Sequence, residues 1–353
     1  MSEAYLAVAD GSVYRARCRA PGTARGELVF TTAYTGYEES LTDPSYEEQV
    51  LTFSYPLIGN YGVRAERFES DRVHPRAAVA REFTDEVAAW LASAGVPALD
   101  HIETRELVTS VRENGAMRCG VAAGEDASPG DATAELEACR PMSAHADIGE
   151  RVTTPERTVH RGDGIADVAL LDCGAKASIV DSLTDRGADV HVLSCLTGVD
   201  EIRRLDPDLL FLSNGPGDPA TFTNAQSLVE TFVGEIPIAG ICLGQQVVAR
   251  AVGGDTEKMA FGHRGVNQPV RDLESGRVLI TTQNHGYTVS DPGDLTVTQR
   301  NVNDGTAEGL ADHERDVCTR QYHPEANPGP HDARDFFDEV LTMAAPESTV
   351  TAN

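Results

Sequence analysis

The stretch I-P-I-A-G-I-C-L-G-Q-Q-V-V-A-R-A-V, residues 236–252, decides the fold of the second half of the chain. Its first part, 236–241, is a short apolar run that predicts a buried strand, and the pattern from Gly244 to Val252 predicts a helix. Between them, G-I-C-L-G supplies the small residues that a tight strand-to-helix turn requires. The layout is that of a nucleophile elbow with cysteine in place of serine.

Such an elbow places Cys242 at the edge of a sheet, with its sulfur near the N-terminus of the following helix. The helix dipole there favours the thiolate, which is the reactive form of the side chain. A lone cysteine is more commonly a buried structural residue, and on this motif alone both readings stay open.

From residue 167 onward, short apolar runs alternate with helical patterns. Buried strands separated by helices indicate a parallel α/β sheet, in which ligands bind at the carboxyl ends of the strands. The expected strands are 168–172, 189–193 and 209–213, and the expected helices are 177–185, 198–205 and 225–233.

Two further loops follow predicted strands of this sheet. S-N-G-P-G-D-P, residues 213–219, lacks the lysine and hydroxyl residue of a phosphate-binding loop, but its glycines would let backbone N–H groups approach a ligand or an oxyanion. H-P-E, residues 323–325, follows the run 317–322 and offers an imidazole and a carboxylate, which a thiolate nucleophile needs as partners. Taken singly, each loop could equally be a plain surface turn.

The first half of the chain has a different pattern of apolar residues. Strand-like runs at 5–9, 13–16, 27–32 and 49–53 are broken by glycine, and one amphipathic helix is expected at 84–94. We therefore predict an α/β protein with a smaller, β-rich α+β domain at 1–150, a polar linker at 151–166 and a parallel-sheet domain at 167–345. Residues 346–353 are expected to form a tail.

Composition narrows the class of protein. The chain has 56 acidic and 29 basic residues, a formal charge of −27, and only two lysines, Lys176 and Lys258. Acidity spread along the chain argues against nucleic-acid binding and suggests adaptation to molar salt, where charge repulsion is screened; an ordinary acidic protein is the alternative. The absence of a signal peptide or an 18-residue apolar stretch, and seven scattered cysteines, favour a reduced, cytoplasmic protein.

The three strand-end loops, taken in order, resemble class I (triad-type) glutamine amidotransferases over about residues 167–345. The resemblance implies that Cys242 attacks the side-chain amide of glutamine and forms a thioester, with release of ammonia. It also implies that His323 is the general acid/base, that Glu325 orients it, and that the backbone N–H groups of Leu243 and Gly217 form the oxyanion hole.

The first half narrows the family further. T-G-Y-E-E-S-L-T-D-P-S-Y (35–46), S-Y-P-L-I-G-N-Y-G (54–62) and I-E-T-R-E-L (102–107) resemble the small subunit of carbamoyl-phosphate synthetase. D-C-G-A-K (172–176), F-G-H-R-G-V-N-Q-P-V (261–270), Q-N-H-G-Y (283–287) and N-P-G-P-H-D (327–332) agree with it. The implied glutamine-binding residues are Ser45, Gly215, Gly217, Leu243, Gln246, Asn284, Gly286 and Tyr287.

Some positions depart from the family pattern. Tyr287 stands where phenylalanine is common, Gln245 stands where histidine is frequent, and Val266 and Gln268 vary a familiar stretch. None of them belongs to the triad. Ser45 is the one implied ligand from the first domain, so we expect that domain to pack against the second near the substrate.

The resemblance also implies a partner. The chain has no region large enough for an ATP-binding synthetase fold, so ATP, Mg²⁺ and the phosphorylation steps are expected on a large subunit that receives the ammonia. We expect a hetero-oligomer, such as a heterodimer, with no metal or cofactor in this chain and a product that serves arginine and pyrimidine biosynthesis. The alternatives are another class I amidotransferase or a γ-glutamyl hydrolase, which the first domain disfavours, and a catalytically dead subunit, which Cys242 and His323 disfavour.

Overall fold

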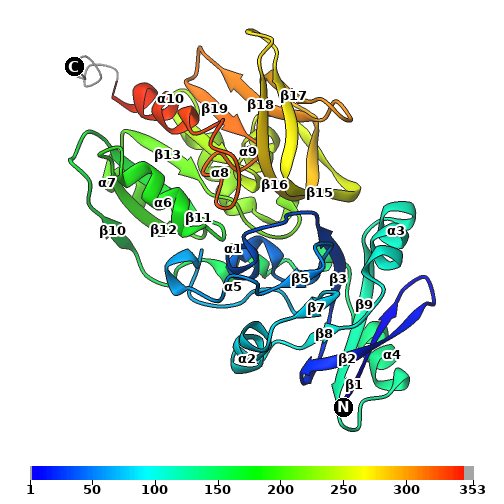
Figure 1. The fold of residues 1–353 in the computed structure, drawn as a ribbon. Coiled ribbons are helices and arrows are strands. Elements are labelled where there is room, and N and C mark those ends of the chain that lie inside the picture. The colour runs from blue at the N-terminus through cyan, green and yellow to red at the C-terminus, as the bar shows by residue number, and fades with distance from the viewer. Residues whose placement is uncertain (1, 346–353) are drawn as a thin grey trace. The chain divides into compact units, whose positions relative to one another are not determined.

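The computed structural model describes residues 2–345 and divides by contact into two compact units. The first contains the chain up to His145 together with Met259–Gly265, and the second contains Ala146–Lys258 and the described chain from Val266 onward. A β-rich unit and a parallel-sheet unit are thus both present, which confirms the predicted fold class (Figure 1). The predicted tail at 346–353 lies outside the described residues.

The first unit is built on a closed barrel of seven strands. Around the barrel these are β1 (Glu3–Val8), β2 (Val13–Ala20), β8 (Ala98–Asp100), β6 (Ala77–Val79), β4 (Gln49–Phe53), β3 (Gly22–Thr31) and β9 (Met117–Gly124). The short strands β5 (Leu57–Ile58) and β7 (Glu82–Phe83) form a separate pair. The helices are α1 (Tyr37–Thr42), α2 (Asp85–Ser93), α3 (Thr104–Asn114) and α4 (Pro129–Ala138), with 3-10 turns η1 (Pro44–Tyr46), η2 (Ala65–Arg67) and η3 (Met142–Ala144).

The alternation of strand side chains builds two cores in this unit. Leu28 and Val50 belong to a cluster that draws on all seven barrel strands and on α3, so it fills the barrel. Their neighbours Val29 and Leu51 point the other way and pack with α1 and α2. The helix predicted at 84–94 is confirmed as α2, which begins directly after its capping residue Thr84.

The second unit is built on a ten-stranded sheet. Five central strands are parallel, and the strands at either side run antiparallel to their neighbours. The order is β10 (Thr158–His160), β12 (Asp189–Ser194), β11 (Asp167–Asp172), β13 (Leu209–Leu212), β14 (Ile238–Ile241), β19 (Val317–Arg320), β18 (Ala307–Asp312), β17 (Thr296–Asn301), β15 (Asp255–Asp272) and β16 (Val278–Asp291).

Helices cover both faces of the parallel strands. Phe211 of β13 packs in a cluster with α6 (Ala177–Thr184) and α10 (Asp335–Ala344). The next residue, Leu212, lies against Gly244 in α9 (Leu243–Ala251). Because successive strand residues point to opposite faces, α9 lies on the other side of the sheet, where α8 (Thr223–Phe232) packs against it. The remaining helices of this unit are α5 (Ile148–Val152) and α7 (Val199–Leu205).

Two features of the second unit differ from the sequence-based expectation. The segment expected as a linker at 151–166 carries the end of α5 and the strand β10, which pairs antiparallel with β12. The pattern of 158–160 is too short and polar to signal an edge strand. Strand β15 also passes through both units, because its middle part, Met259–Gly265, belongs to the first.

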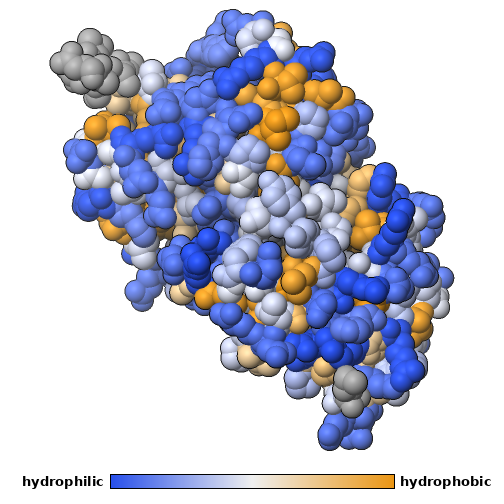
Figure 2. Space-filling model, viewed as in Figure 1, coloured by the Kyte–Doolittle hydropathy of each residue, from blue (hydrophilic) through white to orange (hydrophobic). Residues whose placement is uncertain are grey.

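The face of the molecule in Figure 2 is covered mainly by hydrophilic residues, with apolar residues in small groups. None of the helices that the structure describes is both long and apolar enough to cross a membrane.

Candidate active site

The elbow places Cys242 between the end of β14 and the start of α9. Its backbone has φ 55° and ψ −105°, a left-handed conformation that non-glycine residues rarely adopt. The turn is tightly enclosed: a Cβ atom on Gly240 would lie 2.8 Å from the carbonyl carbon of Gly244, and one on Gly244 would lie 2.3 Å from the backbone oxygen of Leu212. Both glycines are therefore required, as the sequence predicted, and the Cys242 side chain is buried.

His323 follows β19 and lies beside the cysteine. Its backbone N–H donates to the Thr282 oxygen at 2.8 Å, which fixes the loop on β16. Ring atom Nδ1 lies 2.6 Å from Oε1 of Glu325, and Nε2 has no hydrogen-bond partner among the described nitrogen and oxygen atoms. Burial lowers the pKa of His323, but the Glu325 carboxylate and the Cys242 sulfur outweigh it and raise that pKa to about 10. This environment stabilises the protonated form of the His323 imidazole beside the Cys242 sulfur.

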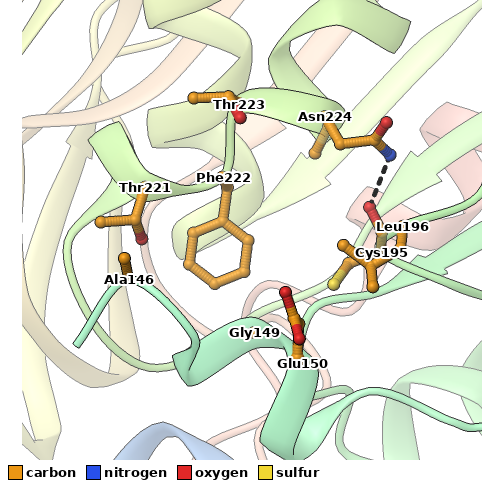
Figure 3. A pocket seen from close by; sticks show the side chains of 10 residues that line it. Ala146, Gly149, Glu150, Cys195, Leu196, Thr221, Phe222, Thr223 and Asn224 are labelled. Atoms are coloured by element: carbon orange, nitrogen blue, oxygen red, sulfur yellow. Dashed lines mark hydrogen bonds between the residues drawn. The ribbon is translucent and has the colours of Figure 1, made fainter.

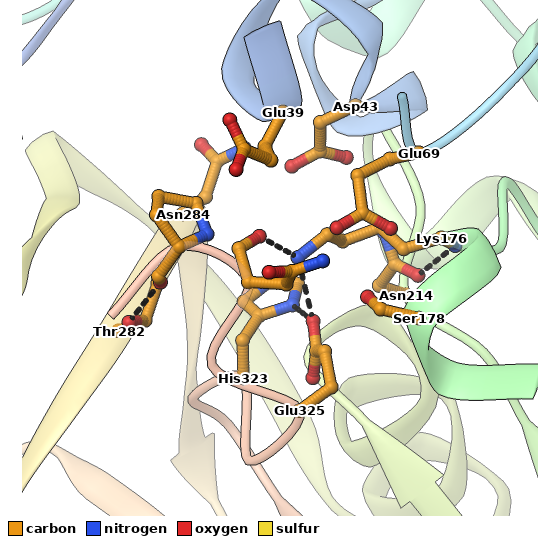
Figure 4. A network of polar contacts seen from close by, with 12 residues as sticks. Glu39, Asp43, Glu69, Lys176, Ser178, Asn214, Thr282, Asn284, His323 and Glu325 are labelled. Carbon is orange, nitrogen blue, oxygen red and sulfur yellow. Dashed lines mark hydrogen bonds and ion pairs between the residues drawn. The ribbon is translucent and has the colours of Figure 1, made fainter. Parts of the chain in front are cut away.

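Glu325 is fully enclosed and holds a second cation in addition to His323. Its Oε1 lies 2.9 Å from Nζ of Lys176 (Figure 4). The same Nζ also donates to the backbone oxygen of Asn327 at 2.6 Å. Burial raises the pKa of Glu325, but the charges of Lys176 and His323 prevail and lower it to about 2. The carboxylate is therefore ionised at neutral pH, despite its burial.

Sequence reasoning assigned no role to Lys176. The residue stands directly before α6, at the carboxyl end of β11, and its backbone N–H donates to Oδ1 of Asn214 at 3.1 Å. A signal was present, because one of only two lysines in the chain follows a strand of the parallel sheet. The pairing with Glu325 spans 149 residues, and the motif around Lys176 contains nothing that points to H-P-E.

The glycine loop after β13 lies against the elbow. A Cβ atom on Gly215 would lie 2.8 Å from Cδ2 of Leu243, the first residue of α9. Gly217 has φ +91°, and a Cβ atom there would lie 2.8 Å from Cγ2 of Ile148 in α5. Gly215 can approach the elbow, and Gly217 can approach α5, this closely only because neither position carries a side chain.

Strand β16 and helix α9 bring other predicted ligands together. The Cys242 thiol donates to the backbone oxygen of Asn284 at 3.7 Å. Gln246 Nε2 donates to the backbone oxygen of Tyr287 at 2.9 Å and to Oε1 of Gln321 at 3.1 Å, so its amide is held by two acceptors. Gly286 lies between Asn284 and Tyr287 on the same strand. Gln321 is a second residue near the site that sequence reasoning did not single out.

Ser45 and Gln245, two further residues named from the sequence, have hydrogen-bond partners within their own units. Ser45 belongs to the first unit, in η1, where its backbone N–H donates to Oδ1 of Asp43 at 2.9 Å. The departure at Gln245 is accommodated within the second unit, because its buried amide accepts from Thr319 Oγ1 at 3.2 Å and donates to the Ala307 oxygen at 3.4 Å. The amide thus ties α9 to strands β18 and β19 next to the triad.

The second unit also has a separate pocket of about 410 Å³, between α5 and the start of α8 (Figure 3). Its lining is mainly apolar, with Phe222, Leu196 and the thiol of Cys195 among the side chains. Burial raises the pKa of Cys195 to about 11, so this cysteine stays protonated near neutral pH.

Comparison with known proteins agrees with this geometry. The family model of class-I glutamine amidotransferases matches residues 169–343, and that of the carbamoyl-phosphate synthase small chain, CPSase domain, matches residues 6–121. A carbamoyl phosphate synthase small chain from Halobacterium salinarum is 67% identical over 344 residues, which cover 98% of this chain and 97% of that protein. The chain belongs to the carbamoyl phosphate synthase small chain family.

A more distant small chain, from Methanosarcina acetivorans, is 41% identical and covers 97% of this chain and 98% of its own length. Both relatives therefore align with this small chain from end to end, including the barrel unit. Among solved structures, a putative GMP synthase protein from Thermoplasma acidophilum matches 53% of this chain and 96% of its own with a TM-score of 0.45 and 20% identity.

Proposed function

We propose that this small chain is the glutaminase subunit of a glutamine-dependent carbamoyl-phosphate synthetase. The observation that carries the proposal is the buried Cys242–His323–Glu325 array on two adjacent parallel strands, in a chain of this family. A thiolate, an imidazolium and an ionised carboxylate in that order form a set that supports nucleophilic attack on an amide.

We propose that the reaction uses this array as follows. The Cys242 thiolate attacks the side-chain amide carbon of glutamine, and the developing oxyanion is stabilised by the backbone N–H groups of Leu243 and Gly217. His323 then donates a proton to the amide nitrogen, and the C–N bond breaks. Ammonia departs, and the glutamyl group remains bound to Cys242 as a thioester. Water, deprotonated by His323, attacks the thioester, which gives glutamate and returns the thiol.

Lys176 and Glu325 act through His323 in this scheme. Glu325 keeps the imidazole oriented by accepting from Nδ1, so Nε2 faces the sulfur and the substrate. Lys176 keeps Glu325 ionised, because its ammonium lies 2.9 Å from the carboxylate in an enclosed site. Neither residue needs to contact the substrate, so we assign both a positioning role.

For the rest of glutamine we propose Gln246, Asn284, Gly286 and Tyr287 from the second unit and Ser45 from the first. Glutamine has a charged carboxylate and a charged amine in addition to its amide. The short hydroxyl of Ser45 suits one of those charged ends. Gln246 is suited to the same task, since its amide is already fixed by the Tyr287 oxygen and Gln321.

We further propose that the ammonia passes to a large synthetase subunit, where ATP and Mg²⁺ bind and carbamoyl phosphate is made. The described units carry a barrel and an amidotransferase-type sheet, and the sequence has no phosphate-binding loop. Direct transfer between subunits has a physical advantage, because free ammonia is protonated at neutral pH and the ammonium ion is not a nucleophile.

The test is Cys242→Ser in the complex with the large subunit. Glutamine-dependent synthesis of carbamoyl phosphate should be abolished, while synthesis from added ammonia should stay at the wild-type rate. Labelling by a glutamine-like affinity reagent should also disappear. A Cys242→Ser complex that still hydrolyses glutamine at a comparable rate would refute the assignment of the nucleophile.

A further inference from the structure

The turn that carries Ser45 is short, and within it the Tyr46 N–H donates to the Asp43 backbone oxygen at 3.1 Å and the Glu47 N–H donates to the Pro44 oxygen at 3.0 Å. It joins α1 to β4 in the first unit, and the Asp43 carboxylate accepts from the Ser45 N–H at the start of η1. A turn of this length needs additional partners to hold a side chain in one place, because loops otherwise sample several conformations.

Those partners come from a segment later in the chain, residues 69–76. On the near side of Ser45, the Glu69 N–H donates to Thr42 Oγ1 at 2.8 Å, and the Ser70 hydroxyl donates to the Thr42 backbone oxygen at 2.6 Å. The His74 N–H donates to the Leu41 oxygen at 3.0 Å. The end of α1 is therefore bound at three points.

The same segment binds the chain on the far side of Ser45. The Arg76 N–H donates to the Gln49 oxygen at 2.7 Å, at the start of β4. The Glu47 side chain accepts from Nη2 of Arg72 at 3.2 Å and lies 3.1 Å from Nδ1 of His74. Residues 69–76 thus hold the Ser45 turn from both ends.

His74 is the centre of this arrangement. Its backbone N–H binds the Leu41 oxygen, Nδ1 faces Glu47, and Nε2 lies 2.9 Å from Ser70 Oγ. His74 and Glu47 are 4% and 2% exposed, so water cannot replace a lost partner freely. Burial raises the pKa of Glu47, but the bond to His74 and the charge of Arg72 outweigh burial and lower that pKa, so the carboxylate is ionised.

We propose that His74 is a positioning residue of the glutamine site, which holds the Ser45 turn in the conformation that binds substrate. The inference rests on the proposed contact between Ser45 and glutamine. It assigns His74 no contact with the substrate: the ring acts through Ser70, which donates to Thr42 at one end of the turn, and through Glu47, which stands at the other end.

A different reading of the same residues is that Ser70, His74 and Glu47 form a second hydrolytic triad. Their order matches a nucleophile, a base and an acid. The hydrogen bonds argue against this reading, because Ser70 Oγ lies 2.6 Å from the Thr42 oxygen and 3.2 Å from the Arg72 oxygen, two acceptors that compete with the ring nitrogen at 2.9 Å for its single proton. A serine that already donates to a backbone oxygen is not activated by the histidine, and the cluster serves the turn.

The experiment is a double-mutant cycle in the complex with the large subunit. His74→Asn, which cannot span both partners of the ring, should raise the KM for glutamine about five- to tenfold, since a bond to a buried partner is lost. The kcat for glutamate formation should change less than about twofold, and ammonia-dependent synthesis should be unchanged. Ser45→Ala should raise KM as well, and adding His74→Asn to Ser45→Ala should raise KM no further.

Two variants separate positioning from general stability. His191 in the second unit is also buried, at 4% exposed, and is bonded to Arg157 and Asp167, so His191→Asn is a matched control that should leave KM unchanged. If His74→Asn fails to fold, Glu47→Gln keeps the shape but removes the charge that faces His74, and it should raise KM in the same way.

The outcomes are distinct. Three results would overturn the inference. The first is that the effects of His74→Asn and Ser45→Ala on KM add in full. The second is that His74→Asn lowers only kcat, and the third is that His191→Asn raises KM as much as His74→Asn does. A Ser45→Ala complex with wild-type KM would overturn it together with the proposed Ser45 contact. The glutaminase assignment is tested separately by Cys242→Ser, whose result does not depend on Ser45 or His74.

Discussion

At the scale of single residues, the roles of His323 and Glu325 differ and should be separable. His323→Asn should lower the kcat for glutamine hydrolysis by about a hundredfold or more, because thiolate formation and protonation of the leaving nitrogen both fail. Glu325→Gln should cost less, about tenfold, because an amide can still accept from Nδ1. Steady-state glutamate formation by each complex measures this, and the reverse order of the two effects would contradict the assigned roles.

Lys176 offers a second residue-scale prediction, which concerns pH. Burial raises the pKa of Glu325, and the Lys176 ammonium is the largest of the causes that lower it to about 2, so Lys176→Met should raise that pKa toward its usual value. Glu325 is ionised only above its pKa, and the acid limb of the kcat/KM profile should therefore move to higher pH. The other lysine provides the control, because Lys258 is exposed and Lys258→Met should leave the profile in place. Superimposable profiles of Lys176→Met and wild type would contradict the role of Lys176.

The residues also show what sequence can and cannot predict at this scale. Cys242 was predictable because its own flanking glycines are required by the turn it occupies. Lys176 was not, because its role depends on Glu325, which is distant in sequence and meets it only through the parallel sheet. His74 was missed because its partners Glu47 and Ser70 belong to a loop region without a regular hydrogen-bond pattern, so no local motif connects the three residues.

At the scale of elements, the elbow makes a prediction about α9 as a unit. In Gly244→Ala the new Cβ would lie 2.3 Å from the Leu212 backbone oxygen, so the helix must move away from β13. We expect a loss in the free energy of unfolding on the order of 2 kcal/mol and a fall in glutaminase activity, since Cys242 is the N-cap residue of that helix.

The control is Gly198→Ala at the start of α7, where a Cβ atom meets nothing within 4 Å and the backbone φ is −87°. Gly198 is the N-cap residue of α7, where alanine is less favourable than glycine, so the free energy of unfolding, measured in urea, should fall by no more than about 1 kcal/mol. Equal losses in the free energy of unfolding for the two alanine variants would contradict the close approach of Gly244 to the Leu212 oxygen.

The elements of the parallel sheet were also the ones that sequence predicted best. The strand expected at 209–213 and the helix expected at 177–185 are β13 and α6, because buried strands and amphipathic helices have distinct periods. The strand β10 in the expected linker and the passage of β15 through the first unit were not foreseen. Both depend on which neighbours are available to pair, and a local pattern does not contain that information.

At the scale of the whole molecule, the formal charge of −27 predicts a dependence of stability on salt. At low ionic strength, repulsion among carboxylates disfavours the compact state, and added salt screens it. The melting temperature should therefore rise as KCl increases from about 0.1 M to about 2 M. Sucrose at matched water activity controls for general exclusion effects, and a melting temperature that is flat or falling in KCl would contradict the prediction.

The scarcity of lysine has a practical outcome for anyone who wishes to label or immobilise this chain. Lys176 is enclosed by the Glu325 carboxylate and the Asn327 oxygen, so an amine-reactive ester cannot reach it in the folded state. Lys258 is exposed. Apart from the α-amino group, a fluorophore or a surface linker would therefore attach at one defined side chain. Peptide mapping of the conjugate should find Lys258 modified and Lys176 untouched until the chain is denatured.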